Sequence, residues 1–134
     1  MKFDKKNMYI GQIVYGRKSG NAARYTKPGN IEDYIVLGTV SALGRKYFTV
    51  KGFSYSSSET EFEYENGIEK TNYSPCYYPY LTKEEIYEEF DRKKYLKAIS
   101  DFVQYSKCDK NFETKHLKYF YDKIVEFENK KEGN

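Results

Sequence analysis

Leu43-Gly44-Arg45-Lys46-Tyr47-Phe48-Thr49-Val50 is the stretch that decides the fold. The side chains of a strand alternate between its two faces, so Phe48 and Val50 are expected on one face and Tyr47 on the other. A second stretch, 59–65, alternates glutamates with apolar or β-branched residues in the same way. Together the two stretches predict an antiparallel pair of strands.

The alternation also predicts how the two strands are aligned. Phe48 is expected opposite Phe62, and Val50 opposite Thr60. On the other face, the same register sets basic and aromatic residues opposite glutamates: Arg45 with Glu65, Tyr47 with Glu63, and Lys51 with Glu59. Such cross-strand pairs contribute about 0.2–1 kcal/mol each, which helps to fix the register.

The flanking segments predict the remaining strands of a small barrel. Strands are expected at 8–15 and 33–43, with a long basic loop at 16–30 between them and a bulge or barrel corner at Gly38. A loop at 52–58 is expected to join the third and fourth strands, and the Asn66-Gly67 turn is expected to return the chain as a fifth strand at 68–73. The predicted architecture is a small SH3-like β-barrel of about five strands, covering residues 1–73.

After the barrel the pattern becomes helical. An aromatic connector with two prolines is expected at 74–81. Thr82 and Glu85 form a capping box that predicts a helix to about Tyr105, and Thr114 is expected to cap a second helix whose apolar residues pack on the first helix or on the barrel. The helical hairpin is placed at 82–130, with a frayed tail at 131–134. The fold class is therefore α+β.

Composition and single residues favour a protein that is not an enzyme. The chain has 134 residues, with 16 Tyr and 9 Phe to build a core. It shows no apolar segment long enough for a membrane span, so a cytoplasmic location is expected. Cys76 and Cys108 are expected to be reduced thiols, with no metal or cofactor. The single His116 has no partner nearby in sequence and is expected to be a surface or packing residue; nothing in the sequence raises a catalytic dyad with Cys76 above chance.

The charges are divided unevenly along the chain. Residues 1–58 hold ten Lys and Arg against three acids, a net +7, whereas residues 59–134 hold thirteen against seventeen, a net −4. The segment 16–28 has four cations, one aromatic ring and no acid, and is the best candidate for binding a polyanion. The predicted binding residues are Arg17, Lys18, Arg24, Tyr25 and Lys27, extended by Arg45 and Tyr47. The alternatives are a solubilising loop, or two halves of opposite sign that attract each other.

The acidic row of the fourth strand permits a second interpretation. Glu59, Glu61, Glu63 and Glu65 are spaced along one strand and do not converge on an ion. They are expected to be solvated or paired with cations. Alternatively, such a row mimics a phosphate backbone toward a basic partner.

Three segments carry a resemblance to a known group of proteins. Asn21-Ala22-Ala23-Arg24, the stretch 44–50, and Thr71-Asn72-Tyr73-Ser74-Pro75 followed by a tyrosine-rich connector and a capped acidic helix resemble the small β-barrel proteins of phages and mobile elements in low-GC Gram-positive bacteria. The loop at 52–58 and Pro79 depart from that pattern. The resemblance implies a phage-type protein in a bacterial host and supplies no catalytic residues.

Small size, the lack of a catalytic motif and the phage-type resemblance lead to the expected function. We expect a non-enzymatic binding protein that inhibits a bacterial antiviral defence, such as a CRISPR nuclease. It would do so by occupying a binding surface of a host defence protein or of its nucleic acid. The alternative is an SH3-like nucleic-acid-binding module that uses the basic loop 16–28.

Overall fold

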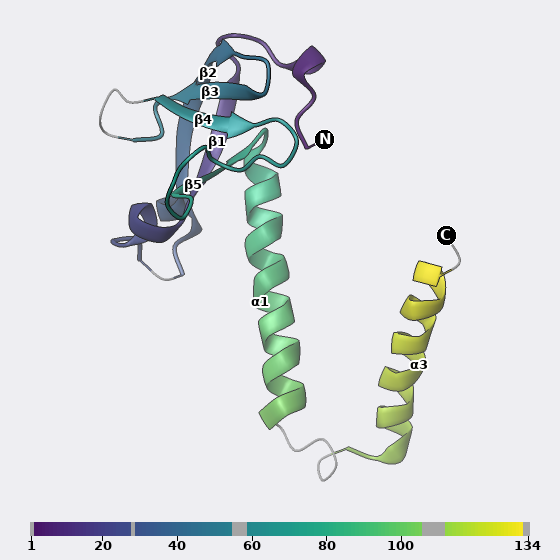
Figure 1. Cartoon of the computed structure of the whole chain (residues 1–134). Helices are drawn as coiled ribbons and strands as arrows, with labels where there is room; N and C mark the ends of the chain where they lie inside the picture. The colour runs from purple at the N-terminus through teal and green to yellow at the C-terminus, as the bar shows by residue number, and fades with distance from the viewer. Residues whose placement is uncertain (1, 28, 55–58, 106–111, 133–134) are drawn as a thin grey trace. The chain divides into compact units, whose positions relative to one another are not determined.

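The computed structural model of the chain describes residues 2–27, 29–54, 59–105 and 112–132. It confirms an α+β fold in which strands come first and helices follow (Figure 1). The chain divides into two compact units, Met1–Asp91 and Arg92–Asn134, which we describe separately. The strands are β1 (Ile13–Lys18), β2 (Ile35–Leu43), β3 (Tyr47–Lys51), β4 (Glu59–Glu63) and β5 (Tyr77–Tyr80); the helices are α1 (Lys83–Tyr105) and α3 (Thr114–Glu132), with short 3₁₀ turns η1 (Lys5–Asn7), η2 (Gly20–Ala23) and η3 (Ile31–Tyr34).

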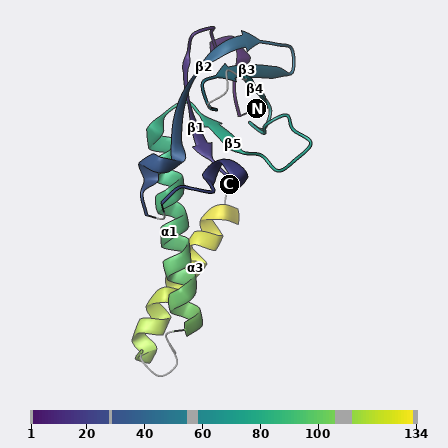
Figure 2. The same cartoon turned by 90° about the vertical axis from the view of Figure 1, so that its left-hand side faces the viewer.

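The five strands form one curled antiparallel sheet in the order β4-β3-β2-β1-β5 (Figures 1 and 2). The predicted small barrel is thus confirmed, but its fifth strand lies elsewhere. Residues 68–73 supply a single bridge, Phe62 to Glu69, and the strand forms instead inside the predicted connector. Pro79 is tolerated there because β5 lies at the edge of the sheet and pairs only with β1, where Pro79 faces Gly16.

The register predicted for β3 and β4 is confirmed. Phe48 pairs with Phe62, Val50 with Thr60, Tyr47 with Glu63, and Lys51 with Glu59. The predicted pairing of Arg45 with Glu65 is wrong, because the ladder between β3 and β4 ends at the pair of Tyr47 and Glu63. β3 begins only at Tyr47, because Gly44, Arg45 and Lys46 form the turn from β2, closed by a 2.9 Å hydrogen bond from the Gly44 amide to the Tyr47 carbonyl.

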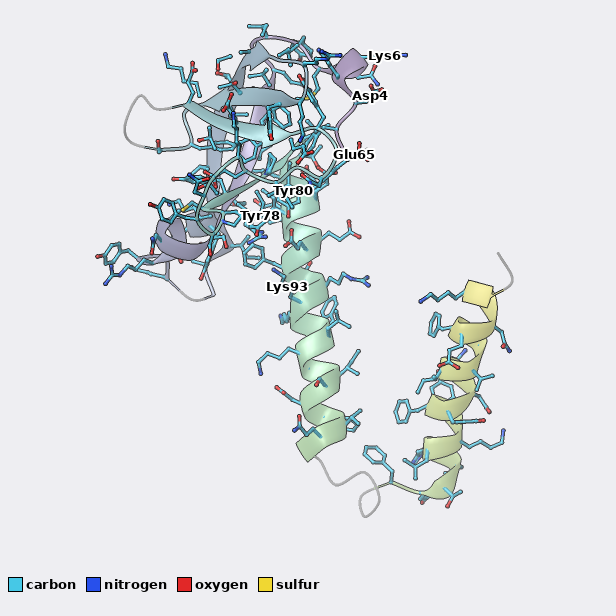
Figure 3. The ribbon with its side chains drawn as sticks, in the orientation of Figure 1. Asp4, Lys6, Glu65, Tyr78, Tyr80 and Lys93 are labelled. Carbon is cyan, nitrogen blue, oxygen red and sulfur yellow. The ribbon has the colours of Figure 1, made fainter. Side chains whose placement is uncertain are left out.

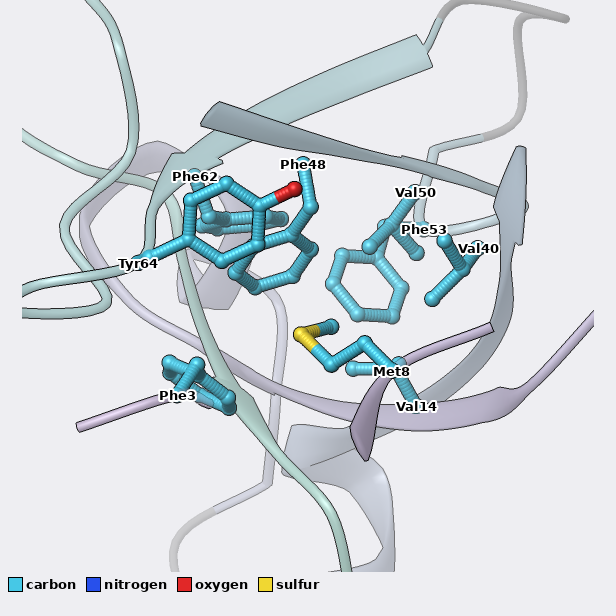
Figure 4. Packing of buried hydrophobic residues seen from close by; sticks show 9 residues of the cluster. All are labelled: Phe3, Met8, Val14, Val40, Phe48, Val50, Phe53, Phe62 and Tyr64. Atoms are coloured by element: carbon cyan, nitrogen blue, oxygen red, sulfur yellow. The ribbon is translucent and has the colours of Figure 1, made fainter. Parts of the chain in front are cut away.

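Aromatic rings fill the core of the barrel unit (Figure 4). The ring of Phe48 is fully buried and lies 5.1–5.6 Å from the rings of Phe3, Phe62 and Tyr64, centroid to centroid. Phe3 reaches the core because hydrogen bonds of 2.9 Å hold the amides of Lys2 and Phe3 against β4's continuation at 64–65. The amino-terminal segment therefore closes one end of the barrel.

Two glycines let the sheet curl around Phe53. A Cβ at Gly16 would lie 2.8 Å from Val36 and 2.9 Å from Phe53, and one at Gly38 would lie 2.6 Å from Val50. Gly16 lies within β1, which begins at Ile13, later than the predicted 8–15, and runs to Lys18, into the segment predicted as a loop. Gly38 is a point of close packing, and the bulge predicted there lies between Val40 and Ala42.

The first part of α1 belongs to the barrel unit. The capping box is present: the Thr82 hydroxyl accepts from the Glu85 amide at 3.3 Å, and the Glu85 carboxylate accepts from the Thr82 amide at 3.1 Å. Ile86 is fully buried, and the ring of Phe90 lies 5.3 Å from that of Tyr34. These contacts dock residues 83–91 on the curled sheet.

The second unit holds the end of α1 and the helix α3. Phe112 lies 5.3 Å from Phe102 and 6.3 Å from both His116 and Phe120, ring to ring. The predicted burial of the apolar residues is not observed, because most of them are exposed: Leu96, Ile99, Phe102, Val103, Leu117, Phe120, Tyr121, Ile124 and Phe127. α3 runs to Glu132, into the predicted tail, and most of the predicted interhelix loop (106–111) lies outside the described residues.

Candidate functional site

One backbone hydrogen bond fastens the start of the basic loop beside the sheet, and a second bond closes the turn that follows. β1 ends at Lys18, and the Ser19 amide donates a 2.7 Å hydrogen bond to the Cys76 carbonyl, just before β5. The turn η2 follows, and the Thr26 hydroxyl donates to the Ala23 carbonyl at 2.6 Å. The side chains after this turn are therefore presented by a hydrogen-bonded scaffold, which is where binding residues concentrate in proteins.

A polar hollow of about 500 Å³ opens beside this loop. We define the polar hollow by its lining residues: Lys18, Ala22, Tyr25, Thr26, Lys27, Glu32, Asp33 and Ile35. Tyr25 is 88% exposed, and the Arg24 guanidinium lies 5.6 Å from the centre of its ring. The structure thus brings together four of the seven predicted binding residues: Lys18, Arg24, Tyr25 and Lys27.

The carboxylates of the polar hollow differ in their surroundings. Glu32 accepts hydrogen bonds from the Tyr87 hydroxyl and from the Lys83 ammonium, the latter at 3.2 Å. These bonds, Tyr87 first and Lys83 second, lower the pKa of Glu32 and hold its carboxylate against α1. Asp33 lines the hollow as well, so the hollow combines cations with acids.

Arg17 serves the fold and does not line the polar hollow. Its guanidinium lies 4.6 Å from the centre of the Tyr78 ring and 3.2 Å from the Glu89 carboxylate of α1. The Tyr80 hydroxyl donates to the same carboxylate, and Figure 3 shows Tyr78 and Tyr80 beside the start of α1. Burial first, and then this bond to Glu89, raise the pKa of Tyr80. Arg17 thus lies against α1 and outside the lining of the polar hollow, and its role in ligand binding stays a prediction.

Arg45 and Tyr47 lie apart from the basic loop. η3 leads into the start of β2, whereas Arg45 and Tyr47 follow the far end of that nine-residue strand. The Tyr47 ring lies 5.5 Å from the Lys46 ammonium and 5.0 Å from that of Lys70. The structure therefore does not join these two residues to the polar hollow.

The acidic row is largely paired with cations. Glu61 lies 3.5 Å from the Lys70 ammonium and Glu63 lies 3.7 Å from that of Lys46, while Glu59 faces Lys51 across the ladder. Glu65 lines a separate hollow of about 520 Å³ together with Arg45, Lys46, Glu63 and Tyr64. These contacts agree with the interpretation that the carboxylates of the row are paired with cations.

A second hollow beside the loop has no counterpart in the sequence-based prediction. This apolar hollow, of about 320 Å³, is lined by Lys18, Ala22, Val36, Leu37, Gly52, Phe53, Ser54 and Tyr77. Leu37 is half exposed although it lies in the middle of the sheet, and the rings of Phe53 and Tyr77 lie 5.5 Å apart. One feature of the sequence points to this hollow: Leu37 is apolar, although the alternation along β2 places it on the exposed face of the strand.

The residues considered for catalysis lie in different units. Cys76 is half-buried, and its amide donates a 2.7 Å hydrogen bond to the Glu69 carboxylate of the barrel unit. His116 belongs to the second unit, where it contacts Phe112. In the described part of the chain no three His, Cys, Asp or Glu side chains are grouped to hold a metal ion. None of the described helices is both long and apolar enough to cross a bilayer.

Fold and site together define a small curled β-sheet domain followed by helices, with a basic loop beside two hollows. The chain belongs to the phage ProQ C-terminal-like domain family, whose model matches residues 1–126. This match confirms the phage-type character that the resemblance implied. A search of curated proteins and a search of solved structures found no match.

Proposed function

We propose that this phage-type domain is a non-enzymatic protein that binds nucleic acid through the basic loop. The observation that carries the proposal is the gathering of Lys18, Arg24 and Lys27 with an exposed tyrosine around the polar hollow. Cations attract the phosphate backbone, and an exposed ring offers a surface on which a base stacks. Arg45 and Tyr47 are left out of the proposed surface because they lie at the other end of β2.

The dependence of binding on salt tests this proposal. Each phosphate contact contributes about 0.7–0.9 to the slope of log K against log salt concentration. Replacing Lys18, Arg24 and Lys27 by Gln in one variant is therefore expected to reduce the slope by about 2 and to weaken binding. Fluorescence anisotropy with a labelled oligonucleotide at several salt concentrations measures both quantities.

A matched variant separates the loop from net charge. Replacing Arg45, Lys46 and Lys70 by Gln removes the same charge near the other end of β2, where two of these cations are already paired with glutamates. This control is expected to leave the slope nearly unchanged. Equal losses in both variants would show that binding follows overall charge, and the proposed site would be wrong.

A second candidate function is the inhibition of a bacterial antiviral defence, such as a CRISPR nuclease, by contact with a protein partner. The observation in its favour is the set of apolar side chains that the second unit exposes, since contiguous exposed apolar surface is typical of protein-binding sites. Membership in a phage family fits such a role. The surface concerned is on α3 and does not involve the basic loop.

Plating of phage on a host that carries the defence tests this second function. Expression of the chain is expected to restore plaques, and Phe120→Ser with Ile124→Ser is expected to abolish the restoration because both side chains are exposed apolar contacts on α3. The three-residue Gln variant of the basic loop is the control and is expected to retain it. Unchanged plating in the presence of the wild-type chain would exclude inhibition of that defence.

A further inference from the structure

The two hollows beside the basic loop are neighbours that share two lining residues, Lys18 and Ala22. We infer that the apolar hollow receives a nucleobase from a single strand whose adjoining phosphate lies at Lys18. This inference rests on the proposed function and deepens it: it names the form of nucleic acid and the place of one base. It concerns Leu37, Phe53 and Tyr77, none of which belongs to the basic loop.

The lining of the apolar hollow suits a planar aromatic ring. Val36 and Leu37 supply aliphatic surface from β2. The half-buried ring of Tyr77 adds aromatic surface, and the buried ring of Phe53, 5.5 Å from it, supports it from the core. Base stacking on aromatic rings is tolerant of sequence, because every base presents a π face. The volume of about 320 Å³ lies at the lower end of the range of about 300–1,000 Å³ for ligand pockets, as expected for a single ring system.

Charge indicates where the phosphate lies. Among its described lining residues the apolar hollow has one charged side chain, Lys18, and no carboxylate. The polar hollow, in contrast, adds Lys27 but also Glu32 and Asp33. A phosphate is therefore best accommodated at Lys18, between the two hollows, with its base on the apolar side and the rest of the strand running toward Lys27 and Tyr25.

This arrangement requires a single strand. In a duplex the bases are paired and stacked, and turning one outward costs a few kcal/mol. In a single strand the bases are already able to leave the stack, so the apolar hollow is filled at little cost. Phosphate contacts alone would not distinguish the two forms in this way.

Three ligands of one length test the inference with the full chain: a labelled single strand of about 12 nucleotides, the same strand with abasic residues, and the corresponding duplex. Anisotropy at fixed low salt is expected to show the normal strand bound about fivefold or more tightly than the abasic strand and the duplex. DNA and RNA strands are compared in parallel to identify the natural sugar.

Leu37→Ala is expected to weaken binding of the normal strand about fivefold and to leave the affinity for the abasic strand unchanged. Leu96→Ala is the matched control, because Leu96 is 55% exposed against 56% for Leu37 and lies in the second unit. Both variants are expected to keep the folded state, because neither leucine is buried. The expected result for Leu96→Ala is wild-type affinity for every ligand.

The outcomes separate this inference from the proposed function. Equal affinity for normal and abasic strands, with the salt slope still dependent on Lys18 and Lys27, would overturn the inference and leave the proposed function standing. A loss from Leu37→Ala that is equal for both strands would overturn it as well, because the leucine would then act without a base. If no oligonucleotide binds in a salt-dependent manner, both proposals fail.

Discussion

Phe48→Ala is expected to lower the free energy of unfolding by about 4 kcal/mol, the largest effect of any single change considered for this chain. The ring is fully buried and contacts rings from the amino-terminal segment, from β4 and from the residue that follows β4's end: Phe3, Phe62 and Tyr64. Removing it deletes contacts and leaves a cavity that these surrounding rings cannot fill without moving. Urea unfolding followed by near-ultraviolet circular dichroism measures the change.

The matched control is Phe127→Ala, the same chemical change on α3 at a side chain that is 67% exposed. It is expected to alter the free energy of unfolding of the barrel unit by less than about 0.5 kcal/mol. If Phe48→Ala does not fold, Phe48→Leu, expected to cost about 1–2 kcal/mol, keeps the measurement possible. A cost below about 1 kcal/mol for Phe48→Ala would contradict the central position of this ring.

The success of the sequence-based prediction around Phe48 has a local cause. Strand alternation fixes which residues face the core, and the glutamates of 59–65 alternate so regularly that a shift by one residue would bury them. The capping box at Thr82 is local in the same sense, and α1 begins at the predicted residue. Both features depend on neighbours within a few positions, which the sequence displays directly.

The fifth strand depends instead on its position in the sheet. Two prolines argue against a central strand, but β5 lies at an edge, where the missing N–H of Pro79 leaves no ladder bond unmade. Gly16 gave a similar error, because it indicates a loop unless Phe53, 37 residues later, is known to pack against it. Neither context is local, so the sequence alone favoured the wrong segment in each case.

The site shows the same division between local and distant information. The clustering of Lys18, Arg24, Tyr25 and Lys27 follows from their closeness in sequence and was predicted. The apolar hollow was not, because it joins β2 to Tyr77 across 40 residues of chain. Arg17 looked like its basic neighbours, and only the fold shows that its partner is the distant Glu89.

Arg17→Met is expected to lower the free energy of unfolding by about 3 kcal/mol, because it removes the ion pair between Arg17 and Glu89 from a partly buried position. The side chains of Arg17 and Glu89 are only 14% and 25% exposed, so water replaces the lost partner incompletely. The change also removes the cation from the face of Tyr78. Met retains the aliphatic stem, so the measured cost reports the guanidinium and not the packing of the chain. Urea unfolding measures it.

Glu89→Gln completes the test, because it removes the charge of Glu89 and keeps an acceptor for the Tyr80 hydroxyl. In the wild-type background it is expected to be destabilising, because the Arg17 guanidinium loses the carboxylate of Glu89. The Nε atom of Arg17 is already buried without a hydrogen-bond partner in the described part of the chain. In the Arg17→Met background it is expected to be neutral or stabilising, giving a coupling energy of about 1–3 kcal/mol. Additive costs would mean that the pair does not fasten α1 to the sheet.

Because Arg17 does not line the polar hollow, the salt slope of oligonucleotide binding is expected to be the same for Arg17→Met as for the wild-type chain. A reduced slope would show that Arg17 belongs to the binding surface.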